Sequence, residues 1–371
     1  MTELACPDQI RASVFVAPGS PLELRRFPRP SLAAGEALVQ ISCATLCGSD
    51  VHTYLGKRHG PAPSVLGHEA VGRIVAFGPG EPLHDYLGQP LRLGDRVSWS
   101  VAACCQECFF CRHELPQKCE RLFKYGHEAC DGEHPLSGGL AEFCHLARGT
   151  AIIRVPPEIP DPVASSANCA TATVAAACRA AGGCHEKNVL IHGAGLLGLT
   201  AAAMAVADGA KNIIVTDIDA KRLARATQFG ATTTVNVADD ASQLMHQIRT
   251  LTDGRGVDVA FEMSGTAEAA AAGLMHLRIG GQLILVGAVR PIGVIPLDVE
   301  TVVRKMWTIQ GVHNYAPGDL ATAIDFLAEN HQRFPFAELV TEEFPLDHAD
   351  EAFCRMVETG AVRVAVRPYI G

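Results

Sequence analysis

The sequence predicts an α/β protein of two domains, in which a β-rich domain is split by an inserted, doubly wound domain with a parallel sheet. Three observations lead to this fold class. The chain has 371 residues, which is more than one ordinary domain contains. Its first part consists of β-branched runs that are broken by Gly and Pro. From about Ala164 onward, Ala-rich helical stretches alternate with apolar runs, which is typical of βαβ units.

The β-rich domain is expected to span residues 1–170 and 311–371. Its predicted strands lie in SVFVAPG, ALVQISC, AVGRIVAFGPG and DRVSWSV, and no long amphipathic helix separates them. After about Lys305 the segments WTIQGVHNY and VRVAVRP bring back the strand–loop pattern. These two segments are therefore expected to complete the first domain.

The inserted domain is expected over residues 171–310. The apolar runs NVLIHGAG, NIIVTDI, VDVAFEMSG and GQLILVGAV predict strands, and stretches such as GLLGLTAAAMAVADGA predict the helices between them. Strands and helices that alternate in this way build a parallel sheet with helices packed against it.

Composition excludes several classes of protein. Hydrophobic residues make up 48% and charged residues 19% of the chain, as in a globular enzyme with a large core. The net charge of −9 argues against a nucleic-acid partner. No apolar run approaches the roughly 20 residues of a membrane span, and MTELACPDQIR lacks a signal-peptide hydrophobic region. Fourteen cysteines then predict metal sites and reduced thiols in the cytoplasm, with no membrane partner.

Four of the cysteines predict a structural zinc site. Cys105, Cys108, Cys111 and Cys119 form the pattern CxxCxxCx₇C within residues 104–119. Tetrahedral Zn²⁺ binds four thiolates at about 2.3 Å, and a closed set of four leaves no position open for chemistry. His113 lies inside this loop, but a complete set of thiolates does not need it as a ligand.

A glycine-rich turn predicts a dinucleotide site. Gly193, Gly195 and Gly198 lie between an apolar strand and an Ala-rich helix. The first glycine permits a tight turn, the second lets the backbone approach a pyrophosphate, and the third allows close helix–strand packing. Asp217 ends the next strand, where its carboxylate can accept hydrogen bonds from ribose hydroxyls and repel a 2′-phosphate. These residues favour NAD over NADP.

The spacing of the four-cysteine loop resembles that of the zinc-containing alcohol dehydrogenases of the medium-chain dehydrogenase/reductase superfamily, and the resemblance covers nearly the whole chain. The segments LPQKC, KYGHEA, PLSGGLAE, CATATV, GAGLLGLTAAA and TIQGVHNY are most similar to the phosphonate-catabolism-associated subgroup. The resemblance implies a GroES-like catalytic domain, a Rossmann cofactor domain, and two zinc ions and NAD per chain. It also implies a homodimer or a homotetramer that pairs edge strands from GQLILVGAV and IGVIPLDVE.

By the same resemblance, a second zinc ion is catalytic. Its ligands would be Cys47 in CATLCGSDVH, His68 in LGHEAVG and Cys169 in ANCATAT, with one position left open. Glu69 would lie behind the metal, or swing in as a fourth ligand when substrate is absent. Asp50 would orient His68 through the second ring nitrogen.

The third ligand has two alternatives. Some polyol-type relatives use Glu there, and the nearby acids in this chain are Glu158 and Asp161, in a Pro-rich stretch. The other alternative is that Cys169 is simply a buried core cysteine. Against both, Cys169 precedes Thr173 by four residues, as in relatives whose Thr contacts the nicotinamide.

The resemblance also implies a mechanism. Zinc would lower the pKa of the alcohol oxygen, and the nicotinamide would accept the hydride. Ser49 and His52 would then relay the proton to solvent. Gly48 replaces the Arg or His that many relatives place on the pyrophosphate. Further cofactor contacts are expected from Thr173, Gly287, Arg222 and Arg363, where Arg363 would compensate for Gly48 or be a plain surface arginine, and Lys221 with Arg222 could tolerate a phosphate.

Basic residues suggest a substrate that carries an anion. The loop YLGKRHG holds Lys57 and Arg58, and Arg is suited to bidentate binding of phosphonate oxygens. The further substrate candidates are Val101, Lys124 in FKYGHE, and His313 in GVHNY. The alternative for these charges is a solvated face, and for His127 it is a hydrogen bond within its loop.

The leading hypothesis is therefore an NAD-dependent zinc alcohol dehydrogenase acting on a small alcohol or carbonyl compound. Its alternatives are a polyol or amino-alcohol dehydrogenase of the sorbitol or threonine type and, more remotely, a dinucleotide-binding sensor without turnover.

Overall fold

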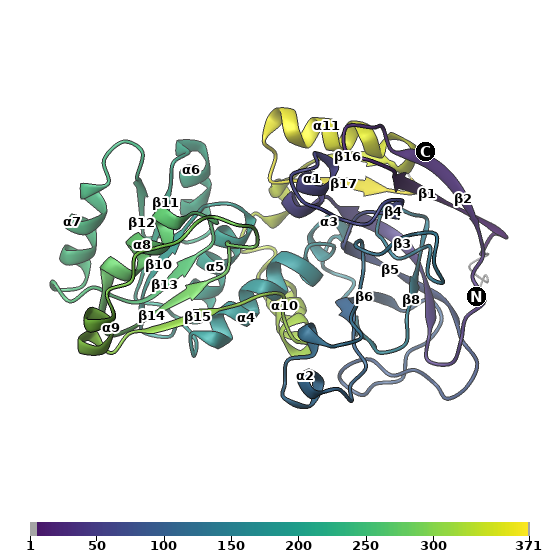
Figure 1. Cartoon of the computed structure of the whole chain (residues 1–371), viewed down its shortest axis with the longest axis horizontal. Coiled ribbons are helices and arrows are strands. Elements are labelled where there is room, and N and C mark those ends of the chain that lie inside the picture. Colours follow the sequence, from purple (N-terminus) through teal and green to yellow (C-terminus); the bar gives the residue numbers. More distant parts are fainter. Residues whose placement is uncertain (1–5, 370–371) are drawn as a thin grey trace. The chain divides into compact units, whose positions relative to one another are not determined.

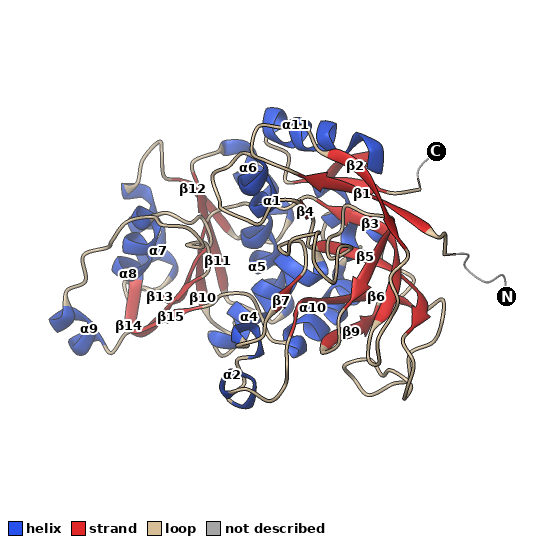
Figure 2. Ribbon diagram, turned by 45° about the vertical axis from the view of Figure 1, so that its right-hand side comes forward, coloured by secondary structure: helices blue, strands red, loops and turns tan. Residues whose placement is uncertain are grey.

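The computed structural model describes residues 6–369 and divides into two compact units, which Figure 1 colours along the sequence. Unit 1 contains the residues up to Cys169, together with Ala316–His331 and the residues from Phe336 onward. Unit 2 contains Ala170–Tyr315 and Gln332–Pro335. Figure 2 shows that strands dominate unit 1 and that unit 2 has helices around one sheet. The predicted fold class is confirmed. The first residues of MTELACPDQIR lie outside the described range.

Unit 1 is built on two sheets. The larger has the order β16-β17-β3-β5-β6-β7, with β8 paired to β3 and β9 to β6, and the smaller has the order β2-β1-β4. The strands are β1 (Gln9–Phe15), β2 (Glu23–Pro28), β3 (Ala37–Thr45), β4 (Ser64–Val65), β5 (Glu69–Phe77), β6 (Arg96–Ala103), β7 (Phe123–Lys124), β8 (Phe143–Leu146), β9 (Thr150–Arg154), β16 (Val340–Pro345) and β17 (Arg363–Arg367).

Strand β3 explains how this sheet forms a core on both faces. Seven of its nine residues are buried, and alternate residues point to opposite sides of the pleat. Val39 and Ile41 pack into one apolar cluster with Trp99, whereas Leu38 packs into a second cluster with Phe353. A strand buried on both faces has few polar positions, as the run ALVQISC has.

Short helices close unit 1 around these sheets. The helices are α1 (Gly48–Tyr54), α2 (Phe109–Arg112), α3 (Asp161–Ala164), α10 (Pro317–Asn330) and α11 (Ala349–Thr359), with 3₁₀ turns at Pro116–Lys118, Phe336–Leu339 and Leu346–His348. A π-helical turn, Ala167–Thr171, leads out of unit 1 at Cys169. None of the helices between residues 6 and 369 is long and apolar enough to cross a membrane.

Unit 2 is a six-stranded parallel sheet in the order β12-β11-β10-β13-β14-β15. This is the doubly wound order, whose direction reverses between β10 and β13. The strands are β10 (Asn188–His192), β11 (Asn212–Asp217), β12 (Thr233–Asn236), β13 (Val257–Glu262), β14 (Leu277–Leu285) and β15 (Thr308–Gly311).

Helices cover both faces of this sheet. Leu190 packs with residues of α7 and α8 in one core cluster, whereas its neighbour Ile191 faces Gly198 of α5. Because adjacent residues of a strand point to opposite faces, α5 lies on the other side of the sheet from α7 and α8. The helices of unit 2 are α4 (Ala172–Ala180), α5 (Leu196–Ala207), α6 (Ala220–Gln228), α7 (Ser242–Leu251), α8 (Ala267–His276) and α9 (Val299–Lys305).

The end of the inserted segment differs from the prediction. The sequence TIQG in WTIQGVHNY forms β15, which pairs with β14 in unit 2 and does not return to unit 1. The predicted edge strands are also wrong: GQLILVGAV forms β14, which is paired on both sides, and IGVIPLDVE leads into α9 without forming a strand. The reason is that a β-branched run of four residues fits the edge of either sheet equally well, and only tertiary pairing decides.

The fold of unit 1 predicts unequal effects of two truncations in α11. Phe353 is fully buried and stacks on Tyr54 with ring centroids 4.5 Å apart, whereas Val357 is 45% exposed. Phe353→Ala should lower the free energy of unfolding by about 3–5 kcal/mol. Val357→Ala, one helical turn later, should cost less than about 1 kcal/mol. Equal losses in chemical denaturation of the two variants would contradict the packing of α11.

Candidate active site

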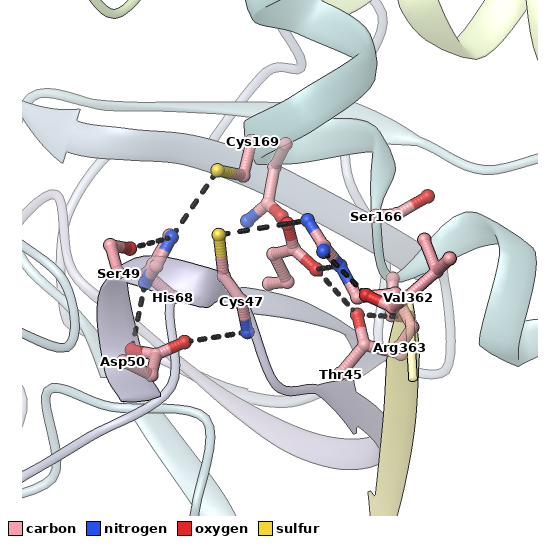
Figure 3. Close-up of polar contacts among 12 residues, drawn as sticks. Thr45, Cys47, Ser49, Asp50, His68, Ser166, Cys169, Val362 and Arg363 are labelled. Atoms are coloured by element: carbon pink, nitrogen blue, oxygen red, sulfur yellow. Dashed lines mark hydrogen bonds and ion pairs between the residues drawn. The ribbon is translucent and has the colours of Figure 1, made fainter. Parts of the chain in front are cut away.

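Four side chains from separate elements of unit 1 converge on one point. Cys47 precedes α1, His68 and Glu69 lie at the start of β5, and Cys169 lies in the π-helical turn. One ligand atom from each of the four lies within 4.8 Å of the ligand atoms of the other three. Figure 3 shows the two sulfurs and the His68 ring turned toward one another. The structure thus brings together all four residues that were predicted for a catalytic metal.

Asp50 fixes the orientation of His68. One carboxylate oxygen lies 3.0 Å from His68 Nδ1 and accepts from the backbone N–H of Gly67, and the other accepts from the N–H of Cys47. Since Nδ1 donates to Asp50, Nε2 is left for a metal. That nitrogen lies 3.2 Å from Cys169 Sγ and 3.4 Å from Ser49 Oγ. Asp50 therefore caps α1 and aims the imidazole with the same side chain.

Arg363 lies beside this group and not at the surface. Its Nε and Nη2 donate to the two oxygens of Glu69, each at 2.7 Å, and Nη2 lies 3.6 Å from Cys47 Sγ (Figure 3). Thr45 Oγ1 donates a third hydrogen bond to Glu69 at 2.7 Å. The alternative of a plain surface arginine is wrong, because Arg363 is 5% exposed and Glu69 is fully buried. A pyrophosphate contact from Arg363 stays a prediction.

Strand register explains why these distant residues meet. Thr45 pairs with Glu69 between β3 and β5, and with Ala365 between β3 and β17. The backbone N–H of Leu46 also donates to the carbonyl oxygen of Val364. Three adjacent strands therefore deliver the threonine, the glutamate and the arginine to one place below Cys47.

Charges around the site set the protonation of its ligands. A hydrogen bond from Cys169, followed by the positive charges of Arg363 and His68, lowers the pKa of Cys47 well below its ordinary value despite burial. The reciprocal contact and burial raise the pKa of Cys169. Burial opposes a charged His68, but Asp50 and Cys47 outweigh it and raise its pKa to about 10. The site is therefore prepared to hold negative ligands and one cation.

The donor set fits zinc. Two thiols and one imidazole are common zinc ligands, and tetrahedral geometry places such an S and N about 3.5 Å apart. The observed 3.2 Å between His68 Nε2 and Cys169 Sγ is close to that value. Glu69 is held by Arg363 and Thr45, so in this arrangement it backs the site. Neither Glu158 nor Asp161 belongs to the ligand cluster, and Asp161 instead pairs with Arg96 at 2.6 Å.

The four-cysteine loop forms a second compact group. Sγ atoms lie 3.9 Å apart between Cys105 and Cys111 and between Cys108 and Cys119. Tetrahedral zinc with bonds of about 2.3 Å requires about 3.8 Å. Backbone N–H groups, led by that of Glu107, lower the pKa of Cys105 to about 6. The loop therefore has both the spacing and the thiolate character of a structural zinc site.

The glycine turn of unit 2 has the geometry that a dinucleotide needs. Gly193 has φ +97°, and a Cβ there would lie 2.9 Å from the backbone N of Ser264. A Cβ on Gly198 would lie 1.8 Å from the carbonyl oxygen of Gly193, whereas one on Gly195 would meet nothing within 4 Å. Gly195 precedes α5, so open space faces the first N–H groups of that helix, where a phosphate binds readily.

The other predicted cofactor residues lie on unit 2. Asp217 ends β11, is 8% exposed, and accepts from the backbone N–H of Ala194 at 2.7 Å. Arg222 is exposed in the first turn of α6, and Thr173 is half-buried in α4. Gly287 follows β14, where a Cβ would lie 2.4 Å from the backbone N of Gly265. Asp217 and the glycines therefore share the edge formed by the strands' carboxyl ends.

The predicted substrate residues separate into two groups. Arg58 and Lys124 lie near the metal ligands, since the charges of Arg58, Cys169 and Lys118 all act on Lys124. Lys57 is exposed at the surface. Val101 is buried in β6, where its carbonyl accepts from the N–H of Tyr125, and His313 is exposed on unit 2.

His127 is a neutral neighbour of His68. The two ring centroids lie 5.2 Å apart, and Nδ1 of His127 donates to the carbonyl oxygen of Tyr125 at 2.8 Å. Burial, reinforced by the positive charges of His68 and Lys124, lowers the pKa of His127 to about 3. The hydrogen bond within its own loop is therefore present, and it leaves Nε2 without a proton.

Sequence reasoning missed two residues that shape these sites. Thr45 supports Glu69, and Lys118 adds positive charge near Lys124. Thr45 carried no local signal because its role depends on strand register. Lys118 was hidden among the residues of the zinc loop.

Comparisons with known proteins agree with this geometry. The family model described as "Alcohol dehydrogenase GroES-like domain" matches residues 33–157, and "Zinc-binding dehydrogenase" matches residues 197–329. The chain is 32% identical over 365 residues to 5-exo-hydroxycamphor dehydrogenase of Pseudomonas putida, covering 97% of this chain and 98% of the relative. It is 31% identical to L-threonine 3-dehydrogenase of Burkholderia vietnamiensis, with 93% and 96% covered. An alcohol dehydrogenase structure from Thermotoga maritima superposes with TM-score 0.91 and 30% identity, with 97% and 99% covered.

Two adjacent cysteines provide a matched test of the four-cysteine loop. Cys108 belongs to the ligand cluster, whereas Cys104 lies next to Cys105 but outside that cluster. Cys108→Ser should lower the zinc content by about one ion per chain and lower the melting temperature, because the tetrahedral set loses a thiolate. Cys104→Ser should retain the zinc content of the wild type. The same zinc content in both variants, measured by elemental analysis, would refute the structural zinc site.

Proposed function

We propose a substrate class for this chain, which belongs to the zinc-dependent alcohol dehydrogenases of the medium-chain dehydrogenase/reductase superfamily and is an oxidoreductase acting on alcohols. The substrate is a small alcohol that carries an anionic group, such as a phosphonate, and NAD is the hydride acceptor. This proposal also places the chain with the phosphonate-associated subgroup that its sequence resembles.

Positive charge beside the metal ligands is the observation that carries the proposal. Burial first, and then the positive charge of Arg58, lower the pKa of Lys124, and Lys118 acts in the same direction. Within residues 6–369, neither Lys124 Nζ nor the Arg58 guanidinium has a hydrogen bond or an ion-pair partner. Since like charges held together out of water are unfavourable, an anion bound between them offsets their repulsion.

The position of this charge matches a short substrate. Cys169 is among the groups whose charge acts on Lys124, and Asp50, the one carboxylate in that set, is already bonded to His68 and Cys47. An alcohol with its hydroxyl at the metal and its anion at Lys124 therefore needs only a few bonds between the two groups. The neutral His127 offers Nε2 as an acceptor without adding charge.

The metal and the cofactor supply the reaction chemistry. Zinc held by Cys47, His68 and Cys169 lowers the pKa of an alcohol at its open position. NAD accepts the hydride. The protein's own groups remove the proton: Ser49, whose Oγ lies 3.4 Å from His68 Nε2, accepts it, and His52 of the same helix α1 passes it to solvent. Two zinc ions per chain follow if the four-cysteine loop holds the second.

Two carboxylates support NAD over NADP. Asp217 lies at the end of β11, and Asp219 caps α6 by accepting from the N–H groups of Lys221 and Arg222. A 2′-phosphate next to both acids would be repelled. Arg222 lies 4.0 Å from Asp219, so part of its charge is already matched.

We propose a homodimer or a homotetramer that pairs through β15. This strand is the edge of the unit 2 sheet, and all four of its residues are exposed. Apolar side chains nearby are exposed as well: Val294, Val303 and Met306. An unpaired edge with apolar neighbours is typical of a strand that pairs with a second chain. A cytoplasmic location is consistent with free thiols at all fourteen cysteines.

Two lysines separate an anion-binding role from general surface charge. Lys124→Met should lower kcat/KM for 2-hydroxyethylphosphonate by about 10- to 100-fold, because a charge-assisted contact is lost. The same variant should change kcat/KM for ethanol by less than about threefold. Lys57→Met removes an exposed lysine of the nearby loop and should leave both values unchanged.

Other outcomes would contradict the anionic substrate. Equal losses for both substrates in Lys124→Met would assign the lysine a structural role. If sorbitol or threonine is oxidised faster than 2-hydroxyethylphosphonate by the wild type, the polyol or amino-alcohol alternative holds instead. Cys47→Ala tests the metal independently, since it should abolish turnover and retain NADH binding.

A further inference from the structure

A third group of potential metal ligands lies in unit 1, away from both sets of cysteines. It consists of Glu36, just before β3, His145 in β8, and His134 in the loop between β7 and β8. One ligand atom from each lies within 4.8 Å of the other two. Within residues 6–369, the same criterion identifies only this group and the two candidate zinc sites.

The two imidazoles meet one carboxylate in parallel. Their rings stack with centroids 4.4 Å apart and an interplanar angle of 16°. Nε2 of His145 lies 2.8 Å from Glu36 Oε2, and Nε2 of His134 lies 3.1 Å from Oε1. Stacking therefore aims both Nε2 atoms at the same side of Glu36, which is the arrangement that a shared ion needs.

The group is sheltered but reachable. Glu36 is 8% exposed and His145 is 2% exposed, whereas the side chain of His134 is 21% exposed. The backbone N–H of Ala33 donates to Glu36 Oε2 at 2.8 Å, and Phe123 lies against the His134 ring with centroids 5.2 Å apart. Outer contacts of this kind orient metal ligands, and the His134 side gives an ion a route from solvent.

We propose that Glu36, His134 and His145 bind a divalent transition-metal ion, with Zn²⁺ as the first choice. Two imidazoles and one carboxylate suit zinc, iron, cobalt and nickel, and they leave positions for water. Metal bonds of about 2.1 Å at right angles would place ligand atoms about 3.0 Å apart. The observed 2.8 and 3.1 Å match this spacing, so an ion can enter with small shifts.

Protonation does not oppose the ion. With no ion, each Nε2 carries the proton that it donates to Glu36, and an ion moves that proton to Nδ1 of the same ring. Nδ1 of His145 is buried and has no hydrogen-bond partner among the described residues, so it is equally unsatisfied in both states. Burial lowers the pKa of His145, which keeps the ring neutral and able to bind a metal.

An ion here would tie three separate segments together. It would fasten the loop that carries His134 to the start of β3 and to β8 and, unlike the cysteine sites, it would use no sulfur. This inference does not depend on the proposed substrate, because the group serves no step of the oxidation.

Zinc binding to the full-length protein tests the proposal directly. Equilibrium dialysis against Zn²⁺, followed by elemental analysis, should give about one ion fewer per chain for His134→Ala than for the wild type. His348→Ala, which removes an exposed histidine of unit 1 outside the cluster, should equal the wild type. Equal zinc content in the wild type and His134→Ala would overturn the proposal.

Cobalt spectra identify which site is lost. Cysteine sites give thiolate-to-cobalt charge-transfer bands, and a site of two imidazoles and one carboxylate gives only d–d bands. The difference spectrum between Co²⁺-loaded wild type and His134→Ala should therefore contain d–d bands alone. Charge-transfer bands in that difference would show that a cysteine site had been lost instead, and would overturn the third site. Glu36→Gln, which keeps the side-chain shape, should give the same difference spectrum as His134→Ala.

Discussion

Glu69 is a carboxylate with no exposure to water, and the arrangement of unit 1 around the metal ligands depends on how its charge is matched. Arg363, which lies 294 residues away in the sequence, donates two hydrogen bonds to it, and Thr45 donates a third. A buried charge left without a partner costs several kcal/mol, so strands β3, β5 and β17 must hold this register. The same register places Cys47 and His68 next to each other. The ion pair is therefore a structural requirement of the site as well as a neighbour of it.

Substrate selection is built on the other side of the ligands. Asp50 is occupied by His68 and by the N-terminus of α1, so it does not neutralise the positive charge of Lys124 and Arg58. Hydrophobic pockets separate alcohols of similar size weakly, whereas a charged pocket strongly rejects substrates that leave its cations unpaired. Charge, and not size, is then expected to distinguish the preferred alcohol from ethanol.

Local patterns in the sequence predicted most of the fold and most members of the site. The four-cysteine spacing and the glycine turn are complete within short segments, because each site is formed by one loop. The partner of Arg363 could not be predicted, because it depends on pairing between β3, β5 and β17. The assignment of β15 to unit 2 and the meeting of Glu36 with two distant histidines have the same cause. Lys57 and Arg58 are adjacent in sequence, and only the folded loop shows which one lies near the metal ligands.

The most direct test of the account is the substrate preference of the zinc-replete wild-type protein. NAD⁺ reduction should be followed with 2-hydroxyethylphosphonate, ethanol and sorbitol at matched concentrations. The account predicts that kcat/KM for the phosphonate exceeds the other two by at least ~100-fold, which corresponds to about 2.7 kcal/mol of added transition-state binding. Equal or higher values for ethanol or sorbitol would show that Lys124 and Arg58 do not select the substrate.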